Sequence, residues 1–197
     1  MSEARVSRVE RKTKETLVQV GVNLDVTSPA VIDTGIGFFD HMLEQLAKHS
    51  LFGLSIQAQG DLEVDFHHTV EDVGITLGQA LKEALRSKEG IERYGTFDVP
   101  MDDALARVVL DICGRPYLVL TAQFPQERVG DFETCLVKEF LQAFCTYAGI
   151  TLHAQVTGQN SHHMIEALFK ALGRALRMAA ARNPKISGIP STKGVLE

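Results

Sequence analysis

Apolar and polar residues alternate over several short stretches of the chain, and a period of two is typical of β-strands with one buried face. The stretches that share this pattern are residues 4–10, 15–23, 27–32, 53–59, 94–99, 104–112, 116–122 and 150–156. We expect a strand over each of them, although the segment 27–32 is only a candidate.

Four longer stretches place apolar residues three and four positions apart, which is the spacing of one helix face. We expect these helices near residues 39–49, 68–88, 132–148 and 162–181. In the second of them Val70, Val73 and Leu77 share one face, and Gly90 follows its end. Pro184 follows the last stretch, where it cannot continue a helix.

The order strands, helix, strand, helix occurs twice, and the sequence repeats with it. The segment HHTVEDVGITLGQAL, which starts at His67, aligns with HHMIEALFKALGRAL, which starts at His162. We therefore predict an internally duplicated α+β fold, in which helices cover one face of each sheet and the helices of the two halves pack together. The predicted halves are residues 1–92 and 93–184, followed by a C-terminal tail at 185–197, all in one folding unit.

Three glycines lie inside the predicted helices: Gly74, Gly78 and Gly173. A glycine in a helix interior costs about 1 kcal/mol relative to alanine. We expect that a close approach of two helices at these positions compensates for this cost.

The composition is that of an ordinary globular chain, with 45% apolar and 23% charged residues. No apolar run approaches the roughly 18 residues that span a bilayer, and residues 1–14 are polar, so we expect a cytoplasmic protein with no membrane partner. The formal charge of −5 argues against a nucleic-acid partner, although a local basic cluster can still bind a small anion. The cysteines Cys113, Cys135 and Cys145 lack CxxC spacing, and we expect buried thiols.

The pattern His-His-x-x-Glu occurs twice, at the start of two predicted helices. Imidazole and carboxylate together suit a divalent metal ion. A single copy is more often a helix cap or a surface feature, but a duplicated copy favours metal binding. The residues of the two copies are His67, His68 and Glu71, then His162, His163 and Glu166.

Helix geometry divides each copy between two metal ions. Residues four apart, such as His67 and Glu71, share a helix face. Adjacent residues such as His67 and His68 differ by about 100° around the axis, so they do not easily chelate one ion. Each copy therefore offers a His–Glu pair to one metal and its other histidine to a second.

Two further histidines complete the set of metal ligands. His41 opens a predicted helix, where it could instead act as a cap, and His153 lies on a predicted strand, where a structural role is the alternative. With both included, each of two metals has three histidines and one glutamate, a thiolate-free set that suits Mn²⁺, Fe²⁺ or Zn²⁺. The acidic run from Asp61 to Asp65 could hold ligand imidazoles in one tautomer or form a solvated strand edge.

Five segments together resemble the imidazoleglycerol-phosphate dehydratase family, over about residues 5–195. They are FDHML (39–43), HHTVEDVG (67–74), GRP (114–116), SHH-x-x-E (161–166) and STKG (191–194). The resemblance implies a stand-alone hydro-lyase of histidine biosynthesis, which dehydrates D-erythro-imidazole glycerol phosphate to imidazole acetol phosphate. It also implies a four-stranded sheet with two helices in each half.

The resemblance further implies a cofactor, a site and an assembly. Two Mn²⁺ ions per active site would be held by His41, His67, His68, Glu71, His153, His162, His163 and Glu166. The implied substrate contacts are Glu15, Arg93, Arg115, Lys170, Ser191, Thr192 and Lys193. The assembly would be a homo-oligomer of 24 subunits, built from trimers, with active sites shared between chains. One departure is Phe66, where relatives often have aspartate; it removes no ligand.

For the mechanism, we expect a manganese-bound imidazolate to expel the adjacent hydroxyl through a diazafulvene-like intermediate. Glu15 would be the principal acid or base, and the ligand carboxylates Glu71 and Glu166 could share that work. The tail would close over the substrate. The alternatives are a two-metal hydrolase and a metal-storage shell, and neither accounts for the arginine, lysine and Ser-Thr-Lys elements.

Overall fold

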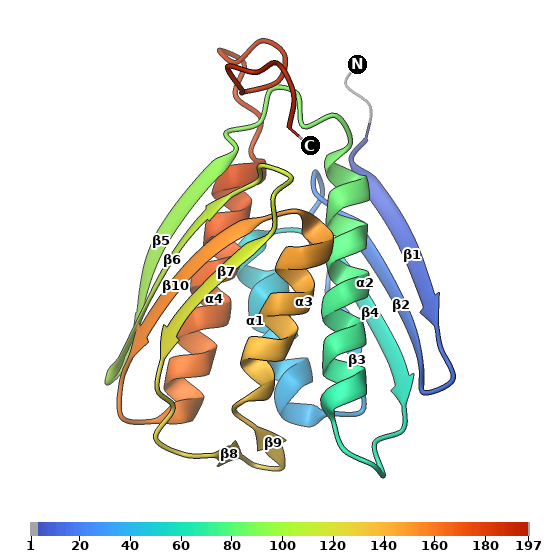
Figure 1. The fold of residues 1–197 in the computed structure, drawn as a ribbon, viewed down its shortest axis with the longest axis vertical. Coiled ribbons are helices and arrows are strands. Elements are labelled where there is room, and N and C mark those ends of the chain that lie inside the picture. The colour runs from blue at the N-terminus through green and yellow to red at the C-terminus, as the bar shows by residue number, and fades with distance from the viewer. Residues whose placement is uncertain (1–3, 197) are drawn as a thin grey trace.

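Two four-stranded sheets enclose four helices in the computed structural model, which describes residues 4–196 (Figure 1). The first sheet contains β1 (Val6–Lys12), β2 (Thr16–Asn23), β3 (Val31–Asp33) and β4 (Gly53–Gly60). The second contains β5 (Tyr94–Met101), β6 (Ala104–Asp111), β7 (Tyr117–Ala122) and β10 (Thr151–Thr157). A short hairpin of β8 (Arg128–Val129) and β9 (Phe132–Glu133) stands apart from both sheets.

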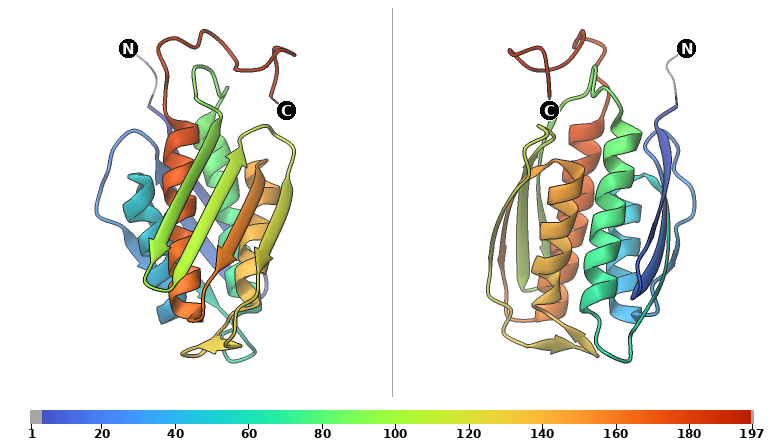
Figure 2. Two further views of the ribbon diagram at one scale, coloured as in Figure 1. Left: turned by 90° about the vertical axis from the view of Figure 1, so that its left-hand side faces the viewer. Right: turned by 45° about the vertical axis from the view of Figure 1, so that its right-hand side comes forward.

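The helices form the inner layers of the molecule, between the two sheets (Figure 2). They are α1 (Gly37–Ser50), α2 (His67–Leu85), α3 (Leu136–Ala148) and α4 (Ser161–Ala180). All four begin at the same end, which is the lower end in Figure 1, and run upward. The segment that follows α4 lies at the upper end.

The two sheets have the same topology. The strand orders are β1-β2-β4-β3 and β5-β6-β10-β7, and in each sheet the first three strands pair antiparallel and the last pair is parallel. The duplicated α+β fold with two helices on one face of each sheet is therefore confirmed. The third strand of the first sheet is shorter than residues 27–32 suggested, since it begins only at Val31.

Alternation along the strands separates the core from the outer surface. On β2 the side chains of Val18, Val20 and Val22 are buried, and on β6 those of Ala106 and Val108 are buried. The residues between them face outward, because successive side chains of a strand point to opposite faces. The core thus lies between the sheets and includes the apolar faces of all four helices.

The helices of the two halves pack in pairs, α1 with α4 and α2 with α3. A Cβ atom added at Gly78 would lie 2.7 Å from the Phe144 carbonyl oxygen, and one added at Gly173 would lie 2.8 Å from that of Leu46. At Gly74 the nearest atom is also a backbone oxygen of α3, at 2.8 Å. The predicted close approach at all three glycines is confirmed.

Replacing Gly78 with alanine is expected to lower the free energy of unfolding by about 1–3 kcal/mol, as overpacking typically does. The new methyl group would meet backbone atoms of Phe144 and Ala148, which cannot move aside as a side chain can. This cost exceeds the gain of about 1 kcal/mol in helix propensity. Gly37→Ala is the matched control, because no atom lies within 4 Å of its added Cβ. Equal melting temperatures for the two variants would contradict the expectation.

Two predicted helix boundaries are wrong. The second helix ends at Leu85 rather than near residue 88, because Arg86 and Lys88 have positive φ angles of 53° and 60°. The third begins at Leu136 rather than near residue 132. Phe132 is apolar and 2% exposed, so it extended the helical pattern, but it belongs to the β8–β9 hairpin.

Burial of the cysteines is confirmed for Cys113 and Cys145 and wrong for Cys135, which is exposed. Burial raises the pKa of Cys145 to about 12, so this thiol stays protonated. Among residues 4–196, none of the helices has the length and apolar character to cross a membrane.

Candidate metal centre

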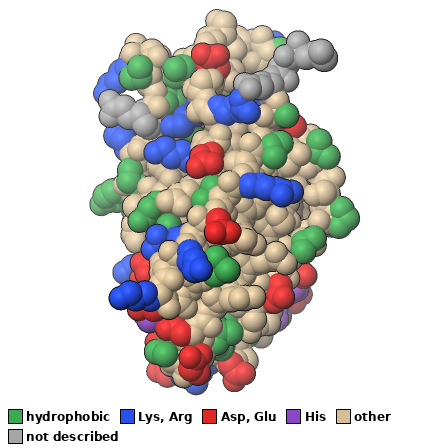
Figure 3. Space-filling view, turned by 90° about the vertical axis from the view of Figure 1, so that its right-hand side faces the viewer, with side chains coloured by type: hydrophobic (Ala, Val, Ile, Leu, Met, Phe, Trp, Pro, Cys, Tyr) green, Lys and Arg blue, Asp and Glu red, His purple; other side chains and the backbone are tan. Residues whose placement is uncertain are grey.

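Both copies of the His-His-x-x-Glu pattern lie at the lower end, because β4 and β10 run down to it and α2 and α4 start there. Figure 3 shows histidines close to acidic side chains at this end. The helix caps come from other residues. Asp65 Oδ1 accepts a hydrogen bond from the His67 backbone N–H (2.7 Å), and Asn160 Oδ1 accepts one from that of His162 (2.9 Å). The imidazole rings therefore remain available for other partners.

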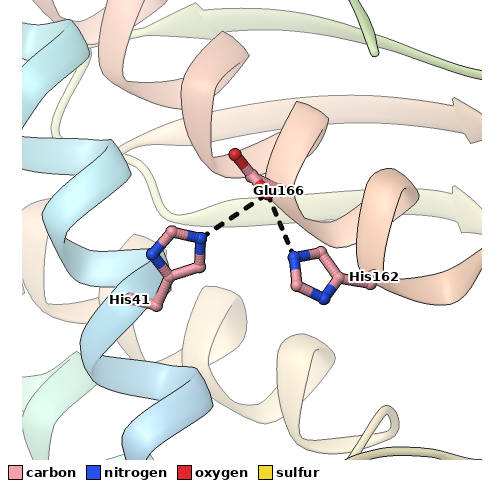
Figure 4. A group of neighbouring side chains, drawn as sticks. All are labelled: His41, His162 and Glu166. Atoms are coloured by element: carbon pink, nitrogen blue, oxygen red, sulfur yellow. Dashed lines mark hydrogen bonds and ion pairs between the residues drawn. The ribbon is translucent and has the colours of Figure 1, made fainter. Parts of the chain in front are cut away.

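The second copy meets His41 from α1, and these side chains form a compact group (Figure 4). Glu166 Oε2 lies 3.1 Å from His162 Nε2 and 3.6 Å from His41 Nε2. Among the described residues, His41, His162 and Glu166 are the one group whose donor atoms lie within 4.8 Å of one another. The arrangement leaves three converging donors, two imidazoles and a carboxylate, which together suit a divalent metal.

Lys170 is the fourth member of this cluster. Its Nζ donates to Glu166 Oε1 at 2.7 Å, one helix turn along α4. Burial alone would raise the pKa of Glu166, but the hydrogen bond and charge of Lys170, with His41 and His162, lower it below its ordinary value. Glu166 is thus an ionised carboxylate whose side chain is only 8% exposed. Its other oxygen faces the two imidazoles.

The neighbouring histidine of the second copy has different partners. His163 Nδ1 lies 2.7 Å from Asp103 Oδ1, and its Nε2 lies 3.6 Å from Asp102 Oδ2. The hydrogen bond to Asp103 raises the pKa of His163, and the same bond lowers that of Asp103 to about 2. Asp103 Oδ2 also accepts from the backbone N–H groups of Gln159 and Asn160, at 2.6 and 3.0 Å.

The carboxylate of Asp103 was not predicted from the sequence. It lies in the two-residue turn between β5 and β6, and an aspartate in a turn is too common to indicate a site. The sequence offered one indication of its role, which is that the turn between β5 and β6 must lie at the same end of the molecule as the second His-His-x-x-Glu copy. With Nδ1 held by Asp103, Nε2 of His163 is the nitrogen left for a metal.

In the first copy, His68 has a carboxylate partner as His163 does. His68 Nδ1 lies 3.0 Å from Asp61 Oδ2 and 3.9 Å from Glu15 Oε2. The hydrogen bond to Asp61 raises the pKa of His68. Of the two alternatives for the acidic run, Asp61 acts as a partner of an imidazole, whereas Asp65 caps the helix. The ring centroids of His67 and His68 lie 6.3 Å apart.

His153 lies apart from both clusters. On β10 the buried residues are Leu152, Ala154 and Val156, which face the helices, while His153 is exposed on the outer face of the sheet. It therefore does not join the other histidines of the same chain. A metal shell that includes His153 needs a second copy of the chain to supply it.

The predicted substrate contacts are divided between the two ends of the molecule. Glu15 and Lys170 lie beside the histidines at the lower end. Arg93 precedes β5 and Arg115 follows β6, and both of these connections lie at the upper end (Figure 1). The tail with Ser191, Thr192 and Lys193 lies there too. Arg93 donates to both carboxylate oxygens of Asp111, at 2.7 and 3.0 Å, and to the Pro190 carbonyl at 2.9 Å.

Comparison with known proteins agrees with this architecture. Residues 34–176 match the family model described as imidazoleglycerol-phosphate dehydratase. The chain is 57% identical over 194 residues to an imidazoleglycerol-phosphate dehydratase from Rhodopseudomonas palustris (strain TIE-1), covering 98% of each chain. It is also 57% identical over 193 residues to one from Limosilactobacillus fermentum, covering 98% of this chain and all of the relative.

Two solved structures are similar over nearly the whole chain. The crystal structure of the dehydratase from Staphylococcus aureus has a TM-score of 0.83 and 44% identity, covering 90% of this chain and 99% of that one. The enzyme from Pyrococcus furiosus, in complex with (S)-C348, has a TM-score of 0.82 and 38% identity, covering 95% and 100%. With the two histidine–carboxylate clusters and the duplicated fold, these likenesses show that the chain belongs to the imidazoleglycerol-phosphate dehydratase family.

Proposed function

We propose that this chain is a hydro-lyase that converts imidazole glycerol phosphate to imidazole acetol phosphate, with two Mn²⁺ ions in a site shared between copies of the chain. Family membership supports the reaction. The observation that supports a site shared between copies is the distance between its two groups of residues in one chain. The histidine–carboxylate clusters lie at the lower end, while the loops and tail with the predicted phosphate-binding cations lie at the upper end.

The residues present fit manganese. The donors are imidazole nitrogens and carboxylate oxygens, without a thiolate, and this set suits Mn²⁺. Glu166 is ionised beside two imidazoles, and carboxylates hold Nδ1 of both His68 and His163. Carboxylate partners of this kind orient the ring so that its other nitrogen can bind a metal. The proposed ligands are His41, His67, His68, Glu71, His153, His162, His163 and Glu166.

When bound, the metal ions would stabilise the anionic form of the substrate imidazole and so favour loss of the adjacent hydroxyl. The chain supplies the proton transfers. Glu15 lies in the turn between β1 and β2, near His68, and its side chain is 56% exposed, so it can reach a substrate carbon. We propose that Glu15 removes the proton next to the leaving hydroxyl, since a general base must lie within hydrogen-bonding reach of that proton.

The phosphate would bind at the upper end of a neighbouring copy. Arg115 is exposed there, and Arg93 fixes the start of the tail through the Pro190 carbonyl. Ser191 and Thr192 add hydroxyl donors, and Lys193 is exposed. Arginine and lysine donors make strong charge-assisted bonds to phosphate. The assembly that we propose is the shell of 24 subunits, which brings upper and lower ends of different copies together.

The reaction is tested with manganese-reconstituted protein and imidazole glycerol phosphate, with the products followed by mass spectrometry. The expected product has lost one water and is a ketone. A product that has gained water would indicate the two-metal hydrolase instead. Metal uptake without any turnover would indicate a storage shell.

Lys193→Ala is expected to raise the KM for the phosphate substrate by about tenfold or more, because a charge-assisted contact to phosphate is lost. The manganese content per chain should stay unchanged, since the tail lies at the end away from the histidines. Lys185→Ala removes an exposed lysine from the same tail and serves as the control. If both variants have wild-type KM values, Lys193 does not bind the substrate.

A further inference from the structure

The contacts between α1 and α4 have the same geometry as those between α2 and α3, as the surroundings of one glycine in each pair show. The Cβ position of Gly173 lies 2.8 Å from a carbonyl oxygen, 3.0 Å from a backbone nitrogen and 3.1 Å from a Cβ of α1. That of Gly78 lies 2.7, 2.9 and 3.0 Å from the same kinds of atom of α3. The matched atoms belong to Leu46, Ser50 and His49 on α1, and to Phe144, Ala148 and Tyr147 on α3. The matched atoms define the register in which residues of one pair correspond to residues of the other.

These counterparts differ at the two positions that set the local charge. Lys170 follows Glu166 by one turn of α4, and the residue at the same place after Glu71 on α2 is Ile75. His41 precedes Leu46 by five residues on α1, and Glu139 precedes Phe144 by five residues on α3. The pair of α1 and α4 thus has a lysine and an imidazole at the positions where the pair of α2 and α3 has an isoleucine and a carboxylate.

In the cluster on α1 and α4, the positive charge of Lys170 balances the negative charge of Glu166. Glu166 and Lys170 are 2.7 Å apart, with side-chain exposures of only 8% and 21%, so the ammonium charge acts strongly on this carboxylate. A cation at Glu166 Oε2 would have the ammonium group as a near neighbour. Like charges at such a distance repel, and the repulsion is weakly screened where both groups are mostly buried.

The counterpart cluster on α2 and α3 lacks this ammonium group. Ile75 is 6% exposed and carries no charge, while Glu71 and Glu139 add one negative charge each. The side chains of Glu139, His67 and Glu71 do not gather as closely as their counterparts do among the described residues. This cluster therefore has an excess of negative charge, which favours a divalent cation.

We infer that the two metal sites bind Mn²⁺ with unequal affinity, tightly at His67–Glu71, where Glu139 takes the place of His41, and weakly at His41–His162–Glu166 because of Lys170. This inference rests on the proposed two-metal function. Histidines supplied by a neighbouring copy complete both sites, but the difference in charge belongs to each chain and persists in the assembly.

The test is a calorimetric titration of the metal-free protein with Mn²⁺, with free ion followed in parallel by electron paramagnetic resonance. The wild type should show two classes of site, one ion each per chain. Lys170→Met keeps the length of the side chain without its charge and should tighten the weak class by about tenfold. Glu139→Gln should weaken the tight class and leave the weak one unchanged.

The classes are assigned with Glu166→Gln, which should abolish the weak class alone. Lys82→Met removes an exposed lysine from the upper end of α2 and should leave both classes as in the wild type. Two equal classes, or an unaltered weak class in Lys170→Met, would overturn the inference while leaving the proposed function intact. Absence of any Mn²⁺ binding would overturn both.

Discussion

Replacing Glu166 with glutamine is expected to lower kcat by more than about 100-fold, since even the loss of an outer partner of a metal ligand costs 10–100-fold. Glutamine keeps the size of the side chain but removes the negative charge that faces His41 and His162, at 3.6 and 3.1 Å. Lys170 would lose its ionic partner as well. The variant should retain one Mn²⁺ fewer per chain, as measured by elemental analysis of the purified protein.

The matched control for this variant is Glu133→Gln. Glu133 forms an exposed ion pair with Arg128 in the β8–β9 hairpin, and such surface pairs contribute little to stability. Circular dichroism and size-exclusion chromatography should show that Glu166→Gln keeps the fold and the assembly. Full activity of a correctly assembled Glu166→Gln protein would remove this carboxylate from the site.

Mixing two impaired variants, one altered at each end of the chain, is expected to give more activity than either variant alone. Glu166→Gln damages the lower end and Lys193→Ala the upper end, which carries the tail. If each site takes Glu166 from one copy and Lys193 from another, random mixing leaves about one quarter of the sites with both residues intact. The measurement is kcat/KM at low substrate concentration after the variants are dissociated and reassembled together.

The control mixture combines Glu166→Gln with Lys170→Met, two lesions on adjacent turns of α4 that are 2.7 Å apart at their functional groups. One copy supplies both Glu166 and Lys170 to a given site, so no site in this mixture has both residues intact. Activity beyond the sum of the two variants in the control mixture, or its absence in the first mixture, would contradict a site shared between the two ends.

Much of this fold follows from short-range patterns in the sequence. Alternation gave the strands, the repeat gave the duplication, and glycines such as Gly78 and Gly173 indicated close helix packing because only a missing side chain permits it. The predicted third helix is too long because Phe132 is apolar and fits the helical pattern, although it lies in a hairpin. Spacing along a chain does not distinguish these two settings at a boundary.

The grouping of His41, His162 and Glu166 agrees with the ligand set predicted from the sequence, but the distribution of the other predicted site residues was not predictable. Helix geometry predicts that His67 and His68 point in different directions, and their ring centroids lie 6.3 Å apart. The position of His153 on the outer face of β10 depends on which side of the sheet the helices cover, and this is a property of the whole fold. The separation of Arg93 from the histidines depends likewise on strand direction, which no local pattern encodes.

The parallel start of all four helices at the lower end has an electrostatic consequence. Each helix carries the equivalent of about half a positive charge at its N-terminus, from backbone N–H groups that point along the axis. Four such ends lie together here, and the carboxylates of Asp61, Asp65 and Asp103 stand beside them. The macrodipoles favour these anions, and they would equally favour negative charge that develops on a bound molecule. The backbone itself would thus favour a bound anion at this end, apart from any contribution of side chains or metal ions.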